Sequence, residues 1–244
     1  MAGYRTADIH NVLLAGRRSG GKTTLAEALL FRAGETNRQG TVDAGTSTSD
    51  FEPEEREHHH SVYSTLLHAT HQGKRINLLD LPGAPDLIGQ AIACLPAAET
   101  MIVVMDPEIG VDSMSRRMVS LAQDFDLPVA IVVNKMSGHV GALAPFLAEL
   151  KETFGRGCLP INLPTDAGNG VVDCLLNGQG DSDLGPVAQF HTELLDQIVE
   201  LDDELMERYL EGEEPNYHAL HEPFERAMDL AHVVPVCFTD ALGD

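Results

Sequence analysis

The sequence has few residues of the types that common nucleic-acid-binding proteins need. Its 244 residues include no tryptophan, and aromatic residues make up only 5%, so stacking platforms for single-stranded nucleic acid are not expected. Basic residues are also few, because 16 Lys and Arg stand against 38 Asp and Glu, for a formal net charge of −22. This balance excludes a general basic surface for RNA and sequence-specific binding to DNA, both of which need a surplus of Lys and Arg. It leaves open docking on a ribonucleoprotein through a local basic patch.

Paired cysteines and long apolar runs are missing too. None of the cysteines forms a Cys-x-x-Cys pair, so neither a zinc site nor a redox pair is indicated for Cys94, Cys158, Cys174 and Cys237. We expect reduced core thiols and a cytoplasmic protein. The longest apolar runs, such as 101–105 and 129–133, are far shorter than the ~20 residues of a membrane helix. Residues 1–11 lack the apolar core of a signal peptide, so we expect no contact with a membrane.

Short apolar stretches alternate with helical patterns along the chain. Up to residue 137 we predict strands at 11–15, 61–68, 75–79, 101–105 and 129–133, helices at 23–32, 86–95 and 112–124, and a polar loop at 33–57. After it we predict a helix at 146–154, small strands at 158–164 and 170–176, a surface loop at 177–185, one long helix at 187–209, a helix at 218–230 and a last strand at 233–238. The acidic run 202–204 is interpreted as the solvated face of the long helix. This alternation predicts a parallel sheet with helices on both faces.

The segment Gly16–Thr23 reads G-R-R-S-G-G-K-T and fits the pattern G-x-x-x-x-G-K-[ST] in full. It follows a predicted strand and precedes a predicted helix, and backbone N–H groups at a helix N-terminus bind phosphate oxygens. We expect Lys22 to reach the β- and γ-phosphates of a nucleotide and the hydroxyl of Thr23 to ligate Mg²⁺. A chance glycine-rich turn is the alternative.

A second polar segment closes the strand predicted at 75–79. It reads Asp-Leu-Pro-Gly and runs from Asp80 to Gly83. A carboxylate at the end of an apolar strand beside a phosphate loop is the expected partner of Mg²⁺. We expect the N–H of Gly83 to bind a γ-phosphate. Taken alone, the four residues would be an ordinary turn.

A third polar segment follows the strand predicted at 129–133. It reads Asn-Lys-Met-Ser, from Asn134 to Ser137. We expect Asn134 and Lys135 to frame a purine base, with the aliphatic stem of Lys135 along its face. The dipeptide is common, and its place after an apolar strand is what favours this interpretation.

Together these segments resemble the GTP-binding domain of translational GTPases, and most closely that of elongation factor G-like proteins. Ser49–Arg56 resembles the segment that leads into switch I. Cys158–Pro164 and Gly170–Asp173 resemble the subdomain insert of that family, and Asp202–Gly212 resembles its long acidic helix. The resemblance runs in order over about 11–242.

The resemblance implies a three-layer α/β/α P-loop NTPase fold with a mostly parallel central sheet and a short subdomain insert. It implies a GTPase core at 1–153, an insert with the long acidic helix at 154–230, and a last core strand with the base-side loop at 231–244. Ser61 matches the switch I threonine that holds Mg²⁺ and the γ-phosphate. Ala241, after Asp240, matches the loop that brackets the guanine.

The implied ligands are GTP or GDP with Mg²⁺. The residues expected to bind nucleotide are Arg18, Ser19, Gly20, Gly21, Lys22, Thr23, Thr24, Asn134, Lys135, Ser137, Asp240 and Ala241. Those expected to hold Mg²⁺ are Thr23, Ser61 and Asp80, and those expected to act in hydrolysis are Lys22 and Gly83. The resemblance also implies the ribosome as a partner, through a larger parent protein.

The sequence departs from the family pattern in three places. Ala84 stands where the family has a histidine that orients the attacking water, and loss of one positioned polar group costs about 10²–10³ in rate. Ser137 stands where the family has an aspartate that accepts two hydrogen bonds from guanine, and a charged hydrogen bond is worth ~1.5–3 kcal/mol. His58-His59-His60 replace most of the switch I sequence Arg-Gly-Ile-Thr. Consecutive side chains point in different directions, so we expect a solvated loop at these histidines, with a metal site or a partner contact as alternatives.

Four hypotheses follow. The first is a slow Mg²⁺-dependent GTPase of the elongation factor G type, and the second is a nucleotide-gated binding module or scaffold with little hydrolysis and relaxed guanine specificity. The third is an ATPase of the broader P-loop class, and the fourth is a degenerate copy that binds no ligand. Single-turnover phosphate release separates the first two, and competition between bases tests the third.

Overall fold

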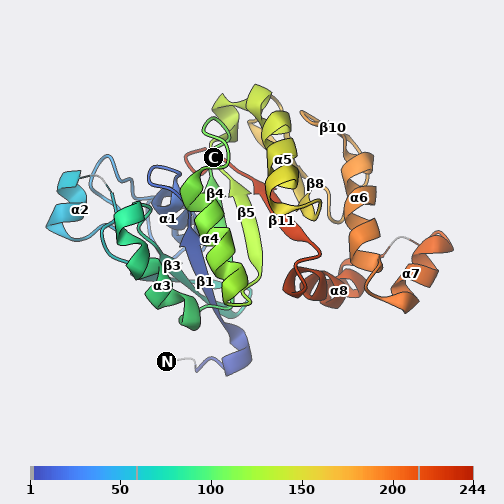
Figure 1. The fold of residues 1–244 in the computed structure, drawn as a ribbon, viewed down its shortest axis with the longest axis horizontal. Helices are drawn as coiled ribbons and strands as arrows, with labels where there is room; N and C mark the ends of the chain where they lie inside the picture. The colour runs from blue at the N-terminus through green and yellow to red at the C-terminus, as the bar shows by residue number, and fades with distance from the viewer. Residues whose placement is uncertain (1–2, 59, 214, 244) are drawn as a thin grey trace. The chain divides into compact units, whose positions relative to one another are not determined.

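The computed structural model describes residues 3–58, 60–213 and 215–243 (Figure 1). By its internal contacts the chain forms two compact units. Unit 1 comprises Met1–Asp106, Asp112–Leu127 and Ala241–Asp244, and unit 2 comprises Pro107–Val111 and Pro128–Asp240.

Unit 1 is built around four strands. In chain order it contains η1 (Thr6–Asp8), β1 (Ile9–Ala15), α1 (Lys22–Arg32), α2 (Pro53–His58), β2 (Thr65–His71), β3 (Lys74–Asp80), η2 (Pro85–Leu87), α3 (Ile88–Cys94), η3 (Leu95–Ala97), β4 (Thr100–Met105) and α4 (Ser113–Asp124). The strands lie in the order β2-β3-β1-β4, with β1 parallel to both neighbours and β2 antiparallel to β3. Helix α1 packs on β1, β2 and β3, and α4 packs on β4.

The core of unit 1 lies between α1 and the strands. Leu14, Ala26, Leu30, Leu67 and Leu78 form one buried cluster. Because β1 and β3 are parallel neighbours, the loops after their carboxyl ends leave the same edge of the sheet. The N–H of Leu81, just beyond β3, donates to the carbonyl of Leu14 (3.1 Å). The segments after residues 15 and 80 are therefore held side by side.

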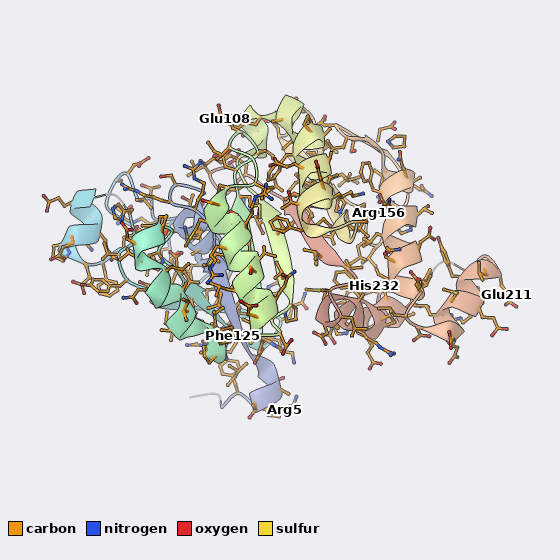
Figure 2. All side chains as sticks on the ribbon, in the orientation of Figure 1. Arg5, Glu108, Phe125, Arg156, Glu211 and His232 are labelled. Carbon is orange, nitrogen blue, oxygen red and sulfur yellow. The ribbon has the colours of Figure 1, made fainter. Side chains whose placement is uncertain are left out.

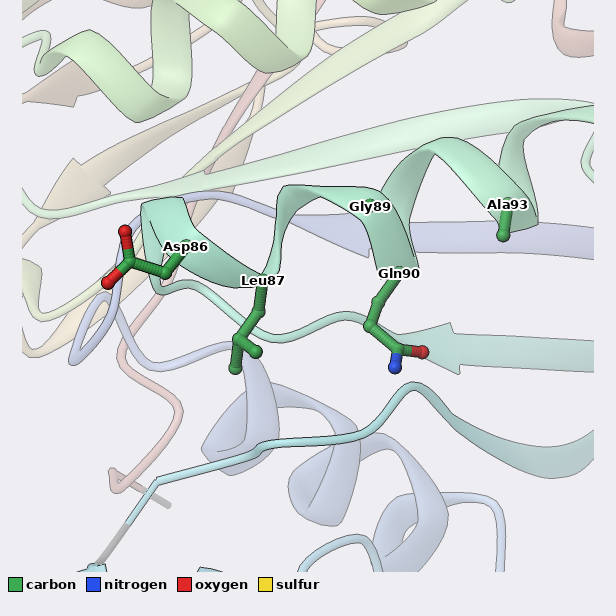
Figure 3. Close-up of a pocket in the computed structure, with 5 residues that line it drawn as sticks. All are labelled: Asp86, Leu87, Gly89, Gln90 and Ala93. Atoms are coloured by element: carbon green, nitrogen blue, oxygen red, sulfur yellow. The ribbon is translucent and has the colours of Figure 1, made fainter.

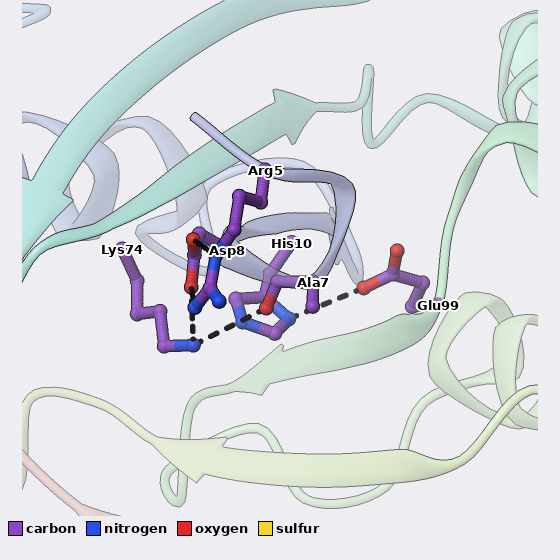
Figure 4. Close-up of polar contacts among 6 residues, drawn as sticks. All are labelled: Arg5, Ala7, Asp8, His10, Lys74 and Glu99. Carbon is purple, nitrogen blue, oxygen red and sulfur yellow. Dashed lines mark hydrogen bonds and ion pairs between the residues drawn. The ribbon is translucent and has the colours of Figure 1, made fainter. Parts of the chain in front are cut away.

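Polar contacts tie the N-terminal turn of unit 1 to its strands (Figure 4). Arg5 Nε donates to Asp8 Oδ2, and Lys74 Nζ lies against Asp8 Oδ1, both at 2.9 Å. These two cations, Arg5 first, hold the pKa of Asp8 well below its usual range. Lys74 Nζ also donates to the carbonyl of Ala7 (3.2 Å). Exposed pairs of this kind add little stability, but they fix η1 beside the start of β3.

Unit 2 combines three parallel strands with a helical group. In chain order it contains β5 (Val129–Val133), η4 (Met136–Gly138), α5 (Val140–Phe154), β6 (Cys158–Pro160), β7 (Asn162–Thr165), β8 (Gly170–Asp173), β9 (Asp181–Ser182), β10 (Gly185–Pro186), α6 (Val187–Val199), α7 (Asp203–Leu210), α8 (Tyr217–Asp229) and β11 (Val234–Phe238). Strand β11 is parallel to β5 on one side and to β6 on the other. Antiparallel pairs join β7 to β8 and β9 to β10. Helix α6 packs against β6, α7 and α8.

The apolar stripe at 187–209 belongs to two helices, so the prediction of one long helix was wrong. Helix α6 ends at Val199. The backbone of Asp202 is extended, and its carboxylate accepts the N–H of Leu205 (2.9 Å), which starts α7. Asp202 is therefore a helix cap and not part of a solvated face. The stripe continues across the break because Ile198 and Leu205 pack in the same buried cluster. Figure 2 labels the exposed Glu211 at the C-cap of α7.

Smaller differences concern where elements begin. Helix α5 starts at Val140 and contains Pro145, whereas the prediction started the helix after that proline. Helix α8 likewise runs through Pro223. Proline removes one intrahelical hydrogen bond, and packing of the helices outweighs that loss at both places. The polar loop at 33–57 contains the start of α2, and β2 lies later than the predicted strand at 61–68. The predicted loop at 177–185 contains the short β9 and the first residue of β10.

The structure also bears on the fold class, the cysteines and the membrane helices considered from the sequence. The α/β class with mostly parallel strands is confirmed. The four cysteines are free thiols; Cys158 and Cys174 are buried and the other two are half-buried. Burial raises the pKa of Cys158 and Cys174 to about 12. Within the described ranges, the structure has no helix that combines the length and the apolar character needed to span a bilayer.

Candidate functional site

The backbone of 16–21 curls between β1 and α1. The residues Gly16, Ser19 and Gly21 have positive φ values of 131°, 64° and 94°. A Cβ on Gly16 would lie 2.4 Å from the carbonyl oxygen of Val104, so only glycine fits there. Gly21 is the N-cap of α1, and within the described chain no side chain caps this helix end. Successive N–H groups in such a loop, with the positive end of the helix dipole, make a concave site for an anion.

Lys22 opens α1 from inside this loop. Its side chain is buried, and its Nζ donates to the carbonyl of Arg17 (2.9 Å). Burial lowers the pKa of Lys22, and the charges of Asp80, Asp112 and Asp50 oppose that shift. The N–H of Gly20 also donates to the carbonyl of Arg17 (3.3 Å), and Thr24 lies half-buried in the first turn of the helix. The ammonium therefore lies across the loop among carboxylates.

The three residues expected to hold a metal ion lie together. Thr23 Oγ1 donates to Asp80 Oδ2 (2.7 Å) and lies 3.3 Å from Ser61 Oγ. All three are buried, and Asp80 is 0% exposed. They come from α1, from the segment before β2 and from the end of β3. Burial raises the pKa of Asp80, while Lys22 opposes that rise.

Two further oxygen side chains join this cluster. Ser49 Oγ donates to Asp80 Oδ2 (2.8 Å), and Ser61 Oγ donates to Asp50 Oδ1 (2.7 Å). Burial raises the pKa of Asp50 as well. Ser49 and Asp50 were assigned no role from the sequence, although they belong to the segment that resembles the approach to switch I. A carboxylate in a polar loop gives no periodic signal, so only the fold identifies it.

The oxygen cluster fits a hard divalent cation. Among the described residues, Asp80 Oδ1 and Asp50 Oδ2 are buried carboxylate oxygens that have no hydrogen-bond partner. Burying such an oxygen without a partner is costly. Mg²⁺ prefers carboxylate and hydroxyl oxygens, and the hydroxyls of Thr23 and Ser61 lie beside these carboxylates. The residues present therefore match Mg²⁺.

A buried carboxylate on α1 holds the loop that carries Ser49 and Asp50. Glu27 is 1% exposed and accepts from the N–H of Gly40 (3.2 Å), from Ser47 Oγ (3.1 Å) and from the N–H of Ser49 (3.3 Å). It also accepts from the N–H of Thr48. One side chain thus fixes both ends of the segment 40–49 against α1.

A second buried carboxylate fixes the approach to Ser61. Glu55, in α2, accepts from the N–H groups of Val62 (2.9 Å) and Tyr63 (3.1 Å). Because these groups directly follow Ser61, Glu55 sets the position of that hydroxyl. Neither Glu27 nor Glu55 was predicted from the sequence. A glutamate facing the core side of a predicted helix was the available signal for Glu27.

Gly83 lies directly on the phosphate loop. Its carbonyl accepts from the N–H of Arg18 (3.0 Å). A Cβ on Gly83 would lie 2.4 Å from Arg18 N and 2.5 Å from Lys22 Nζ. The segment after β3 and the loop after β1 therefore approach at backbone distance.

Ala84 follows Gly83 and starts the turn η2. The residues that follow it in η2 and α3 line a pocket of about 350 Å³, formed by Asp86, Leu87, Gly89, Gln90 and Ala93 (Figure 3). Its polar side chains are one carboxylate and one amide. Neither Ala84 nor this lining supplies an imidazole.

The histidines before Ser61 are described only in part. His60 Nδ1 lies 3.3 Å from the carbonyl oxygen of Ser61. His59 and the side chain of His58 lie outside the described residues, so the expectation of a solvated loop stays a prediction.

The base-side residues lie at the carboxyl ends of β5 and β11, within unit 2. The two strands are parallel, with Val133 opposite Phe238. Beyond them the N–H of Thr239 donates to the carbonyl of Val133 (2.9 Å), and the N–H of Met136 donates to the carbonyl of Thr239 (3.3 Å). Asn134 is buried at this edge, and Lys135 has a positive φ of 65°.

Ser137 and Asp240 meet at this edge. Ser137 Oγ donates to Asp240 Oδ2. Asn162, which the sequence analysis did not single out, bonds Phe238 twice: its Oδ1 accepts the N–H (2.7 Å) and its Nδ2 donates to the carbonyl (3.0 Å). The end of β11 is therefore fixed just before Asp240.

Ala241 belongs to unit 1. It is buried, and its carbonyl accepts from Gln39 Nε2 (2.6 Å). This contact connects the polar loop after α1 to the C-terminal segment.

Comparison with known proteins gives a family match across this whole arrangement. Residues 7–242 match the family described as the elongation factor Tu GTP binding domain. The match includes the loop after β1, the segment after β3 and the ends of β5 and β11.

Two of the similar proteins are named elongation factor G-like proteins. The elongation factor G-like protein of Mycobacterium tuberculosis (strain CDC 1551 / Oshkosh) is 30% identical over 253 residues, which cover 96% of this chain and 35% of that protein. The elongation factor G-like protein of Thermotoga maritima is 30% identical over 247 residues, with the same coverage. A crystal structure of a Thermus thermophilus protein matches with a TM-score of 0.85 and 35% identity, over 96% of this chain and 38% of that one. The chain thus spans about a third of the length of these relatives.

Proposed function

Because the chain belongs to the family of elongation factor Tu GTP-binding domains, we propose that it binds GTP and GDP with Mg²⁺ and hydrolyses GTP slowly. It does so as the GTP-binding domain of an elongation factor G-like translation factor. The observation that supports this most is the buried oxygen cluster of Thr23, Ser61 and Asp80 beside the phosphate loop. Such a cluster has no evident use without a cation.

The proposed roles follow from the positions of the groups. The N–H groups from Arg18 to Thr24 surround the phosphates, and Lys22 turns from the Arg17 carbonyl toward the β- and γ-phosphates. The N–H of Gly83, which lies against the loop, binds the γ-phosphate. Mg²⁺, when bound, neutralises charge on the phosphates. Thr23, Ser61 and Asp80 are the residues that hold it.

On the base side, the proposal assigns Asn134 and Lys135 to frame the guanine, with Ser137, Asp240 and Ala241 around it. Asn134 is buried at the end of β5. Lys135 carries its aliphatic stem to the face of the base.

Slow hydrolysis follows from Ala84. A methyl group neither orients water nor stabilises charge, and the loss of one such group costs about 10²–10³ in rate. Phosphate release in a single turnover measures this step. Release on the scale of minutes to hours supports a slow GTPase, and no release supports the alternative of a nucleotide-gated binding module.

The proposed division of the chain is a GTPase core at 1–153 and 231–244 with an insert at 154–230. Contact with the ribosome is proposed only for a larger protein that contains this domain. A cytoplasmic location is part of the same proposal.

Calorimetric titration with GDP and with ADP, each with and without Mg²⁺, tests the function. We expect Mg²⁺-dependent binding of GDP that exceeds binding of ADP. Lys22→Ala removes the buried ammonium and is expected to abolish phosphate binding. Binding that Mg²⁺ and Lys22→Ala both leave unchanged would contradict the proposal.

A further inference from the structure

The base side contains a carboxylate that the Asn-Lys-Met-Ser segment itself lacks. Guanine offers two hydrogen-bond donors on one edge, its ring N1–H and its 2-amino group. A carboxylate accepts both, and such charge-assisted bonds are stronger than neutral ones. Ser137 offers one neutral oxygen. Its Oγ, however, donates to Asp240 Oδ2, so a carboxylate lies where Ser137 points.

The backbone fixes this pair. Strands β5 and β11 are parallel neighbours, and their register places Val133 opposite Phe238. The bonds from Thr239 to Val133 and from Met136 to Thr239 continue the pairing beyond the strands. Residues 137 and 240 therefore leave the sheet together, although 103 positions separate them in the sequence.

The hydrogen bond leaves the carboxylate able to accept more. An ionised carboxylate has two oxygens with about four lone-pair sites, so it can accept the bond from Ser137 together with bonds from other donors. The hydroxyl that Ser137 donates orients the carboxylate. Ser137 thus acts as a positioning residue for Asp240.

We propose that Asp240 supplies the carboxylate that recognises the N1–H and 2-amino groups of guanine, held in place by Ser137. This inference rests on the proposed function, since it names the specificity residue of the same base site. It makes the chain selective for guanine without an aspartate at position 137.

Xanthine nucleotides provide a direct test. Xanthine carries a carbonyl oxygen where guanine carries the 2-amino group, so it suits an amide and not a carboxylate. In Asp240→Asn, the amide oxygen accepts from N1–H and the amide N–H donates to that carbonyl. We expect GDP affinity to fall by about 10- to 100-fold and xanthosine diphosphate affinity to rise, with ADP unchanged.

Four further variants complete the test. Asp181→Asn removes the same charge from an exposed strand residue of unit 2 and is expected to leave all three affinities unchanged. Ser137→Ala keeps the carboxylate and is expected to lower GDP affinity only a fewfold. Asp240→Ser alone is expected to lose the guanine preference, and the exchange Ser137→Asp with Asp240→Ser is expected to restore it. Circular dichroism melting confirms that each variant folds.

The outcomes separate the two proposals. If the wild-type protein binds GDP with Mg²⁺ and Asp240→Asn leaves the ratio of GDP to xanthosine diphosphate affinity unchanged, the assignment of Asp240 is wrong and the proposed function stands. If the wild-type protein binds no nucleotide, the proposed function fails and the assignment fails with it. An inverted ratio in Asp240→Asn, recovered guanine preference in the exchange variant and no effect of Asp181→Asn together support the assignment.

Discussion

At Gly83 the two phosphate-side segments are in direct backbone contact. A methyl group there would lie 2.4 Å from Arg18 N, which no side chain tolerates without a backbone shift. Overpacking of this kind costs ~1–3 kcal/mol. For Gly83→Ala we expect GTP affinity to fall by about 5- to 150-fold. GDP affinity falls less, because the proposed N–H contact is to the γ-phosphate. Titration with both nucleotides measures this.

Gly89→Ala is the matched control for that variant. Gly89 lies in α3, shortly after Gly83, and a Cβ there would meet no heavy atom of the described chain within 4 Å. Alanine is the better helix former by about 1 kcal/mol, so we expect stability to rise slightly and both affinities to stay. Equal losses of GTP and GDP affinity in Gly83→Ala would argue against a γ-phosphate contact.

The single buried residues that hold the site gave weak signals in the sequence. Glu27 and Glu55 are buried carboxylates, and their use depends on backbone N–H groups outside their own helices. A helical pattern predicts that a residue faces the core, but not that a distant loop will satisfy its charge. The fold alone reveals why these acidic residues are buried.

At the scale of elements, α1 and the loop 40–49 behave as one piece because Glu27 joins them. Glu27→Gln replaces one carboxylate oxygen with an NH₂ group that cannot accept from an N–H. Two or three loop donors then lose their acceptor, depending on which oxygen is replaced, at ~1–3 kcal/mol each. We expect the backbone amides of 40–49 to exchange hydrogen faster. We also expect the factor by which Mg²⁺ increases GTP affinity to fall about tenfold. Exchange mass spectrometry and titration at several Mg²⁺ concentrations test this.

Glu35→Gln removes the same charge from an exposed position just after α1. We expect it to change neither the exchange of 40–49 nor the Mg²⁺ effect. If Glu35→Gln and Glu27→Gln behave alike, the effect is one of net charge and not of the buried hydrogen bonds.

The sequence predicted whether a segment forms a helix or a strand better than it predicted where that segment begins and ends. Apolar runs predicted the strands at 101–105 and 129–133 closely, because parallel strands are buried on both faces and stand out as continuous apolar stretches. The stripe at 187–209 predicted helix but not its interruption at Asp202. The periodicity continues because α6 and α7 pack in one cluster, while the break depends on one local cap.

At the scale of the whole molecule, two buried thiols make stability depend on pH. The pKa of Cys158 and Cys174 is about 12 in the folded protein, against an ordinary value of 9.0. Between these values the unfolded chain releases protons that the folded chain retains. The free energy of unfolding therefore falls as pH rises above 9, by at most ~1.4 kcal/mol per pH unit for each thiol. Urea unfolding at pH 8.5, 9.5 and 10.5 measures the slope.

The double variant Cys158→Ala with Cys174→Ala is expected to show a shallower slope. Leu163→Ala opens a cavity in the same buried cluster as Cys174, so it lowers stability while keeping the slope. Equal slopes for the double variant and the wild-type protein would rule out the thiols as the source.

In the candidate site, short motifs could be predicted from the sequence, whereas contacts between separate elements could not. The phosphate loop, the segment 80–83 and the segment 134–137 are short, and each follows an apolar strand, so their types are readable from neighbouring residues. The contribution of Asp50 and the pairing of Ser137 with Asp240 are not readable in that way, since their partners lie in other elements.

The sequence by itself determined the alternation of the main strands and helices, the backbone turns that require glycine and the family resemblance. These features depend on residues a few positions apart, for which propensity and sterics suffice. Only the tertiary structure decided which oxygens meet around Asp80, which carboxylates hold the loops, and that Ser137 lies against Asp240. Those contacts join residues up to 103 positions apart. They form because parallel strands bring distant loops to one edge of a sheet.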